Sequence, residues 1–247
     1  MVAAGAMLLG ISARASDTDD RIESSAKKSY VFKTYLKDDA IKVNSASGAV
    51  TLTGTVAEDS HKSLAENTVA SLPGVTGVDN QLKTKGENPA EHSDAWIGMK
   101  VKSALLFHRD VRATKTDVNV KDGIVTLSGE ASSQAQKELT TEYARDIDNV
   151  KEVKNDMTVA KTPQPAETIG EKIDDASITA QVKSSLMSHR STSALKTKVA
   201  TVDGIVTVSG IAKNDAEKTL VTKLVTNING VTSVINNMTI AVPVAIN

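Results

Sequence analysis

One sequence pattern occurs three times along this chain, and this repetition restricts the possible folds more than any other feature does. Each copy has an apolar core bounded by two glycines and, farther along, a second short motif that carries two valines. The cores are Gly48-Ala-Val-Thr-Leu-Thr-Gly54, Gly123-Ile-Val-Thr-Leu-Ser-Gly129 and Gly204-Ile-Val-Thr-Val-Ser-Gly210, and the second motifs are Gly74-Val-Thr-Gly-Val78, Asn149-Val-Lys-Glu-Val153 and Gly230-Val-Thr-Ser-Val234.

The spacing of the motifs locates the boundaries between copies. Both motifs shift by 75 residues from the first copy to the second (48 to 123, 74 to 149) and by 81 from the second to the third (123 to 204, 149 to 230). Because the two motifs shift together, the difference between 81 and 75 must fall in a linker between copies. A repeat of this length is long enough to be a small domain, so we expect three such domains instead of one large core.

Apolar spacing predicts the order of elements within each copy. Ile22, Ala26 and Tyr30 are spaced i, i+4 and i+8, which places one apolar stripe on a helix, and the stripe recurs in the other copies. Two alternating strands follow, and the dipeptides between them favour a tight hairpin because both positions tolerate positive φ. These dipeptides are Ser47-Gly48, Asp122-Gly123 and Asp203-Gly204.

The second half of each copy predicts a helix and a last strand. The glycine that closes each core (Gly54, Gly129 and Gly210) is expected to let the chain turn after the second strand. The spacings Ser133 to Gln136 and Asn214 to Glu217 are typical of a capped helix start. The fold class is therefore α+β, with three tandem α-β-β-α-β domains, each a three-stranded mixed sheet with two helices on one face.

Composition shifts give the expected boundaries. We expect a signal-peptide remnant over residues 1–15 and a first domain over 16–85, a linker over 86–93 and a second domain over 94–160, then a linker with two prolines over 161–174 and a third domain over 175–247.

The N-terminus carries a possible export signal. The apolar run from Val2 to Ile11 is too short to span a bilayer, and Ala13-Arg14-Ala15 follows it as a small-x-small cleavage site. The pattern favours the second half of a secretory signal peptide, although the basic segment is missing; the alternative is a disordered apolar tail. No other segment is long enough to cross a membrane.

Composition argues against several classes of function. The 29 Lys and Arg nearly cancel 30 Asp and Glu, so the chain as a whole is not a basic nucleic-acid binder. The absence of cysteine excludes thiolate catalysis and Cys-bound zinc. No histidine has a metal-ligand partner at helical or hairpin spacing, and no nucleotide or nucleophile motif appears. We expect no catalytic residue, no cofactor and no metal.

The repeated motifs, together with a last strand of the form N-x-[LM], resemble the BON domain, a name that stands for bacterial OsmY and nodulation. That strand reads Asn80-Gln-Leu82, Asn155-Asp-Met157 and Asn236-Asn-Met238. The resemblance runs from about Asp17 to Ala241. It implies an OsmY-like protein exported to the periplasm and linked to osmotic and envelope stress. It also implies attachment to phospholipid membranes or to envelope proteins, with a chaperone-like role in some members, and it brings no catalytic residues.

Basic residues after the first helix are the candidate contacts with a membrane or a partner. The pair His108-Arg109 recurs as His189-Arg190, although a core does not require it, and cations near an anionic lipid surface contribute about 1 kcal/mol each. The third copy is the most basic. Trp96 aligns with polar residues, so it either faces a lipid or partner or covers a seam between the first two copies. The candidates are Trp96, Lys100, Lys102, His108, Arg109, Arg112, Lys183, His189, Arg190, Lys196 and Lys198.

Several functions remain open at this stage. The leading hypothesis is a non-enzymatic periplasmic stress protein that binds anionic phospholipid surfaces. The alternative is a chaperone or protein-interaction module for outer-membrane or secreted proteins, whose exposed edge strands accept an extended peptide. A third is a structural spacer along the cell wall. The plain alternative for the basic stretch is a solvated surface.

Overall fold

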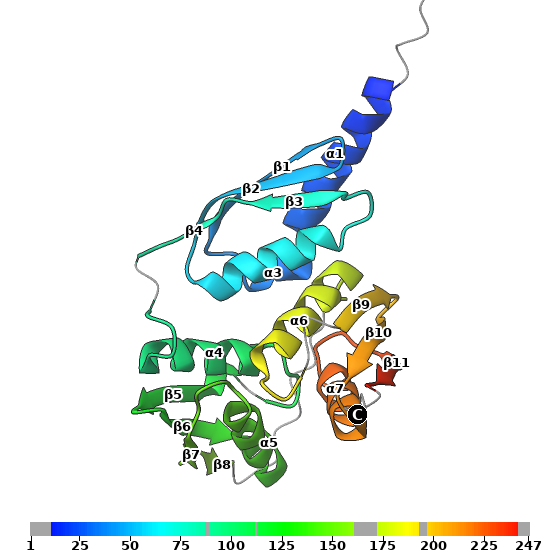
Figure 1. The fold of residues 1–247 in the computed structure, drawn as a ribbon. Helices are drawn as coiled ribbons and strands as arrows, with labels where there is room; N and C mark the ends of the chain where they lie inside the picture. Colours follow the sequence, from blue (N-terminus) through cyan, green and yellow to red (C-terminus); the bar gives the residue numbers. More distant parts are fainter. Residues whose placement is uncertain (1–10, 87–88, 112, 161–171, 193–196, 242–247) are drawn as a thin grey trace, which may run out of the picture. The chain divides into compact units, whose positions relative to one another are not determined.

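The computed structural model describes residues 11–86, 89–111, 113–160, 172–192 and 197–241 (Figure 1). The chain divides into two compact units, Met1–Gly86 and Glu87–Asn247. The first unit contains repeat 1, and the second contains repeats 2 and 3. The expected signal peptide lies mostly outside the described residues, and so does most of the expected proline-containing linker.

Each repeat has the predicted element order. Repeat 1 consists of α1 (Ile11–Lys28), α2 (Tyr30–Thr34), β1 (Ala40–Ala46), β2 (Ala49–Val56), α3 (Asp59–Ala70), β3 (Gly77–Asn80) and β4 (Lys83–Thr84). Repeat 2 consists of α4 (Asp94–Leu106), the short 3-10 helix η1 (Ala113–Lys115), β5 (Thr116–Lys121), β6 (Ile124–Ala131), α5 (Gln134–Arg145), β7 (Glu152–Asn155) and β8 (Thr158–Val159). Repeat 3 consists of α6 (Asp175–Ser188), β9 (Thr197–Val202), β10 (Ile205–Ala212), α7 (Asp215–Thr226) and β11 (Ser233–Ile240).

The three sheets share one topology and confirm the α+β fold class. The middle strand (β2, β6 or β10) pairs antiparallel with the strand before it and parallel with the last strand. A parallel pair needs a crossover connection, and the second helix of each repeat supplies it. In repeats 1 and 2 the last strand is split, so β4 and β8 continue the pairing that β3 and β7 begin, whereas β11 is continuous.

The cores are built from the stripes that the sequence predicts. The leading isoleucines of the first helices, Ile22, Ile97 and Ile178, are all at most 2 % exposed. The inward residues of the middle strands are equally buried: Val50, Leu52, Val125, Leu127, Val206 and Val208. One predicted core position behaves differently between repeats, because Leu64 is buried but its equivalents Leu139 and Leu220 are only half-buried.

The hairpin turns take the predicted left-handed conformation. Ser47 and Gly48 have φ of 54° and 80°, and the two later turns are alike. The sequence analysis missed what holds these turns. In repeat 2 the amides of Asp122 and Gly123 donate to the carboxylate of Asp94 over 2.7 and 2.8 Å. Asp19 and Asp175 accept the same pair of hydrogen bonds in repeats 1 and 3, at 2.8 to 2.9 Å. We call this arrangement the carboxylate clamp; it ties the first helix of each repeat to the hairpin, at the helix start in repeats 2 and 3 and in the middle of α1 in repeat 1.

The expectation for the core-closing glycines was wrong. Gly54 does not end β2, which continues to Val56. Its φ is 118°, and a Cβ there would lie 1.9 Å from the carbonyl oxygen of Ala40 on β1. Gly129 has the same close approach to Lys115, at 2.1 Å. The glycine is therefore required because two strands approach closely, with no turn at that point.

The clamp yields a test in repeat 2. We expect Asp94→Ala to lower the free energy of unfolding of the second unit by about 2 kcal/mol, because two backbone amides lose a charged acceptor. Urea unfolding of the full chain followed by circular dichroism measures the change. Asp117→Ala, an exposed aspartate on β5 of the same repeat, is the matched control. Equal stability of the two variants would contradict a structural role for the clamp.

Candidate functional site

Repeats 2 and 3 pair through equivalent residues. His108 forms an isolated antiparallel bridge with Ile228, and His189 forms the equivalent bridge with Ile147. The amide of Arg109 donates to the carbonyl of Asn227 over 2.9 Å. The amide of Arg190 donates to the carbonyl of Asp146 over 3.0 Å. Each contact occurs twice with the two repeats exchanged, because His189 and Ile147 are the equivalents of His108 and Ile228, 81 residues away in the other repeat. The interface therefore has the two-fold character of an isologous contact.

Repeat 1 has different residues at the pairing positions. Lys33 and Thr34 occupy the places of His108 and Arg109, and Ser71 occupies the place of Asp146. The histidine and arginine that supply the pairing contacts are thus specific to repeats 2 and 3.

Aromatic side chains fill the centre of the interface. The ring of His108 stacks on Tyr143 with the centroids 4.0 Å apart, and His189 lies edge-on to both rings. Nε2 of His108 is 3.2 Å from Oγ of Ser185 on α6. The hydroxyl of Tyr143 accepts a hydrogen bond from Nδ2 of Asn227 over 3.0 Å. Both histidines are buried, so the interface holds two imidazoles away from water.

Burial governs the protonation of His108. Burial, and then the neighbouring His189, lower the pKa of His108 from 6.5 to about 3. Its Nδ1 has no hydrogen-bond partner among the described residues. A proton added there would place a charge in a dry site without an acceptor, so acid disfavours the paired state.

Asp146 fixes the orientation of His189. Nδ1 of His189 is 3.0 Å from Oδ2 of Asp146, and the hydroxyl of Ser191 donates to Oδ1. Burial alone would raise the pKa of Asp146, but the hydrogen bonds from His189 and Ser191 and the charge of Arg190 lower it. The carboxylate is thus an ionised anchor between the two repeats.

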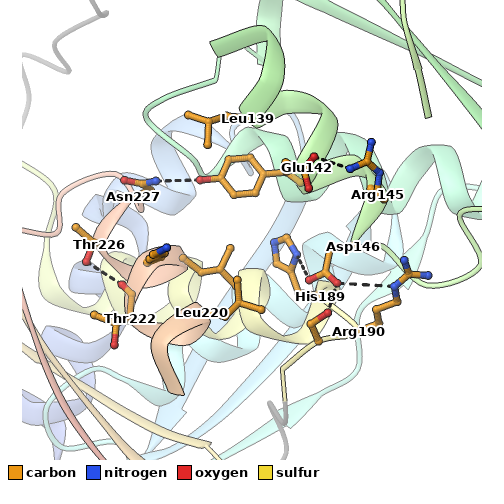
Figure 2. Close-up of a pocket in the computed structure, with 14 residues that line it drawn as sticks. Leu139, Glu142, Arg145, Asp146, His189, Arg190, Leu220, Thr222, Thr226 and Asn227 are labelled. Atoms are coloured by element: carbon orange, nitrogen blue, oxygen red, sulfur yellow. Dashed lines mark hydrogen bonds and ion pairs between the residues drawn. The ribbon is translucent and has the colours of Figure 1, made fainter. Parts of the chain in front are cut away.

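A groove of about 580 Å³ runs beside this interface (Figure 2). Its lining comes from α5, α7 and the segment 189–191, and it includes Tyr143. Leu139 lies on one side and Leu220 on the other (Figure 2). The sequence did not predict this groove. The available signal was Tyr143, which occupies a buried position although its hydroxyl needs a polar partner that one small domain does not provide.

The recurring His-Arg pairs lie in the interface. His108 and His189 are 1 % and 3 % exposed, so their rings do not reach the surface. The guanidinium of Arg109 donates to the carbonyls of Thr226 and Val231, the latter over 3.2 Å. Arg190 is exposed and lies 3.8 Å from Asp146. The two His-Arg pairs thus lie in the interface between repeats 2 and 3, and this location distinguishes them from the other candidate residues.

The remaining candidates are spread over the second unit. Trp96 and Lys100 form a cation–π pair on α4, with Nζ 5.2 Å from the ring centroid, and Lys102 is exposed on the same helix. Lys183 is half-buried on α6, and Lys198 is exposed on β9. The structure does not bring these last two together with Trp96. Arg112 and Lys196 lie outside the described residues.

Neither a cluster of metal-ligating side chains nor a helix able to span a membrane occurs among the described residues. Over residues 11–86, 89–111, 113–160, 172–192 and 197–241, no group of three or more His, Cys, Asp or Glu is placed to hold a metal ion. Within the same ranges, none of the helices has the length and apolar character that a membrane span needs.

The fold and the paired repeats define a class of protein that consists of small tandem α+β domains, two of which contact each other beside a groove. The chain belongs to the BON domain family, which matches residues 18–86, 93–161 and 174–242.

Three known proteins illustrate the relationship. The chain is 28 % identical to Osmotically-inducible protein Y of Escherichia coli over 200 residues, which cover 80 % of this chain and 96 % of that one. It is 35 % identical to the 21 kDa hemolysin of Actinobacillus pleuropneumoniae over 122 residues, 48 % of this chain and 62 % of that one. A solved structure of CdsD, a structural protein of the type III secretion system of Chlamydia trachomatis, is 16 % identical and covers 91 % of this chain and 92 % of that one. Its TM-score of 0.25 is too low to support an argument.

The buried histidine predicts a pH dependence. Because its folded pKa of about 3 lies below the unfolded value of 6.5, the contribution of His108 is fully present above pH 6.5 and declines as the pH falls toward 3. We expect the second unit to lose about 1.4 kcal/mol per pH unit in that window through this residue. In His108→Phe, which keeps a ring against Tyr143, this slope should disappear.

Urea unfolding at pH 4, 5, 6 and 7 measures the slope. The charged and titratable groups facing the ring are His189 and Tyr143, backed by Asp146, Arg190 and Asp110, and all stay in the variant. His92→Asn is the control, since His92 is exposed and its φ of 66° suits asparagine. An unchanged slope in His108→Phe would show that another group controls the acid response.

Proposed function

We propose that this chain is a periplasmic, envelope-associated protein of the osmotic stress response that binds anionic phospholipid surfaces. Membership of the BON family and the similarity to a protein named for osmotic induction support the envelope and stress role. The exposed part of α4 supports the lipid contact. Family and surface point in the same direction, although they rest on separate observations.

The single observation that carries the lipid contact is the cation–π pair of Trp96 and Lys100 on α4; the exposed Lys102, two residues after Lys100, adds a cation on another side of the same helix. We call these three residues the α4 patch. Trp96 is the only tryptophan of the chain, and it is half-buried beside Lys100. A tryptophan with an apolar body and a polar edge favours the lipid headgroup region, and nearby lysines add attraction to an anionic surface. The α4 patch has this combination, whereas the buried histidines at the repeat interface do not.

Vesicle binding tests the α4 patch. We expect the full chain to co-sediment with vesicles containing phosphatidylglycerol, less so at high salt because exposed charges are screened. Trp96→Ala combined with Lys100→Glu and Lys102→Glu should weaken binding at least tenfold, from about 1 kcal/mol per lost cation.

The matched control changes the same charge elsewhere in repeat 2. Lys121→Glu with Lys154→Glu alters two exposed lysines on the sheet, away from the helix layer, and should retain binding. Equal losses in both variants would indicate attraction by net charge alone, and binding to neutral vesicles with the same affinity would reject the proposal.

A second candidate function, binding of extended or unfolded polypeptide, is favoured by the outer sheet face of repeat 3. Val202, Ile205 and Ile235 are 67 %, 41 % and 48 % exposed there. Repeat 2 has Lys121 and Lys154 at the positions of Val202 and Ile235. Exposed apolar residues in place of charges are typical of a contact surface.

An aggregation assay without lipid tests this second function. We expect the wild-type chain to suppress light scattering of an unfolded outer-membrane protein diluted from urea. Val202→Lys with Ile235→Lys, which installs the residues of repeat 2, should abolish most of the suppression because the contact surface loses its apolar character. Ala216→Lys with Thr219→Lys adds the same charge on the exposed side of α7 and should have no effect. Suppression that survives the first pair of changes would exclude this face.

A further inference from the structure

The groove between α5 and α7 has the size and shape of a site for a small molecule. Its volume of about 580 Å³ lies in the range of ligand pockets. It does not involve the α4 patch, and no residue of the proposed membrane contact lines it. Its apolar and aromatic lining residues are Leu139, Tyr143, Leu220 and Leu224.

Leu139 and Leu220 line this groove, although packing within a single repeat would favour their burial. Leu139 and Leu220 occupy the position of Leu64, which repeat 1 buries to 1 % exposure. In repeats 2 and 3 the same position is left half-buried at the groove wall. The pairing of repeats therefore creates an apolar trough that neither repeat closes, and an alkyl chain fits such a trough because it has no polar groups to satisfy.

The charges around the groove are unequal. Its cations are Arg145, Arg190 and Lys223, against the carboxylates of Glu142 and Asp146. Glu142 is paired with Arg145, and Asp146 accepts from His189 and Ser191 and lies near Arg190. Within the described parts of the chain, no ion pair is formed by Lys223. The unneutralised charge at the rim is therefore positive, and it suits an anionic head.

From the apolar walls and the cationic rim, we propose that the groove binds a single-chain anionic amphiphile, one alkyl chain with a carboxylate or phosphate head. The alkyl chain of the ligand lies between Leu139, Tyr143 and Leu220, and its anionic head lies at Lys223. A fatty acid and a single-chain lipid phosphate share this chemistry. The site is distinct from the α4 patch, which contacts a surface and does not enclose a molecule.

Calorimetric titration of the full chain tests the proposal with defined probes below their micelle-forming concentrations. We expect dodecanoate and dodecyl phosphate to bind with one-to-one stoichiometry, and the comparison identifies the preferred head. Each methylene added to the alkyl chain should strengthen binding about fourfold. Dodecyl maltoside and dodecyltrimethylammonium should bind much more weakly, and inorganic phosphate alone should not bind.

Variants locate the site. Lys223→Glu should weaken dodecanoate binding about fivefold, from reversal of one exposed charge contact. Leu220→Gln should weaken it further by adding a polar group to the wall. Lys218→Glu makes the same charge change on α7 outside the lining, and Trp96→Ala removes the α4 patch; neither should alter the affinity. Because Lys223 is exposed, its variant retains the fold, which thermal unfolding verifies.

The outcomes separate this proposal from the membrane proposal. Equal binding of the neutral or cationic amphiphile, equal losses in Lys223→Glu and Lys218→Glu, or phosphate binding as tightly as dodecyl phosphate would each overturn the groove. Vesicle sedimentation reports on the α4 patch alone. Loss of vesicle binding with intact dodecanoate binding would therefore reject the membrane proposal alone. Intact vesicle binding without dodecanoate binding would reject the groove proposal alone.

Discussion

The carboxylate clamp is the contact on which the rest of each repeat depends. An aspartate of the first helix accepts both amides of the hairpin turn: Asp94 and Asp175 lie in the first turn of α4 and α6, and Asp19 lies in the middle of the longer α1. The contact fixes one point of that helix relative to the hairpin, and from there the apolar stripe of the helix packs on the inward face of the strands. Hydrophobic packing between the helix and the sheet is not directional, so the clamp is needed to select one register for it. Because charged hydrogen bonds are directional, the clamp supplies what hydrophobic packing does not.

The same scaffold carries different surfaces in its three copies. Repeats 2 and 3 replace Lys33 and Ser71 of repeat 1 with the histidine and acidic or amide residues that pair them. Repeat 3 differs again, since its outer sheet face has Val202 and Ile235 where repeat 2 has lysines. Internal positions are constrained by packing, so variation is concentrated on faces. Function is set by such faces and not by the fold that the repeats share.

The sequence predicted the parts of the structure that local patterns encode. Helical stripes such as that of Ile97, and hairpins such as Asp122-Gly123, follow from spacing and backbone preference within a few residues. The recurrence of His108 and His189 was visible too, but the sequence could not show that the two rings lie against each other, because contact across repeats depends on packing far along the chain. Leu139 stands at the position that Leu64 fills in the core of repeat 1, and the sequence does not show for the same reason that it lines a groove. Gly54 was misjudged because close approach of a neighbouring strand has no signature in the glycine itself.

The two-fold character of the pairing between repeats 2 and 3 has a consequence for how many chains it can join. Each half of the contact needs only a partner with the complementary set of residues, and a second molecule of the same sequence offers that set as well as the first does. Within one chain the two halves are covalently joined, which favours the intramolecular arrangement. Exchange of repeat 3 between neighbouring molecules would preserve every hydrogen bond at Arg109 and Arg190 while linking the molecules into a reciprocal dimer, with the balance set by local protein density.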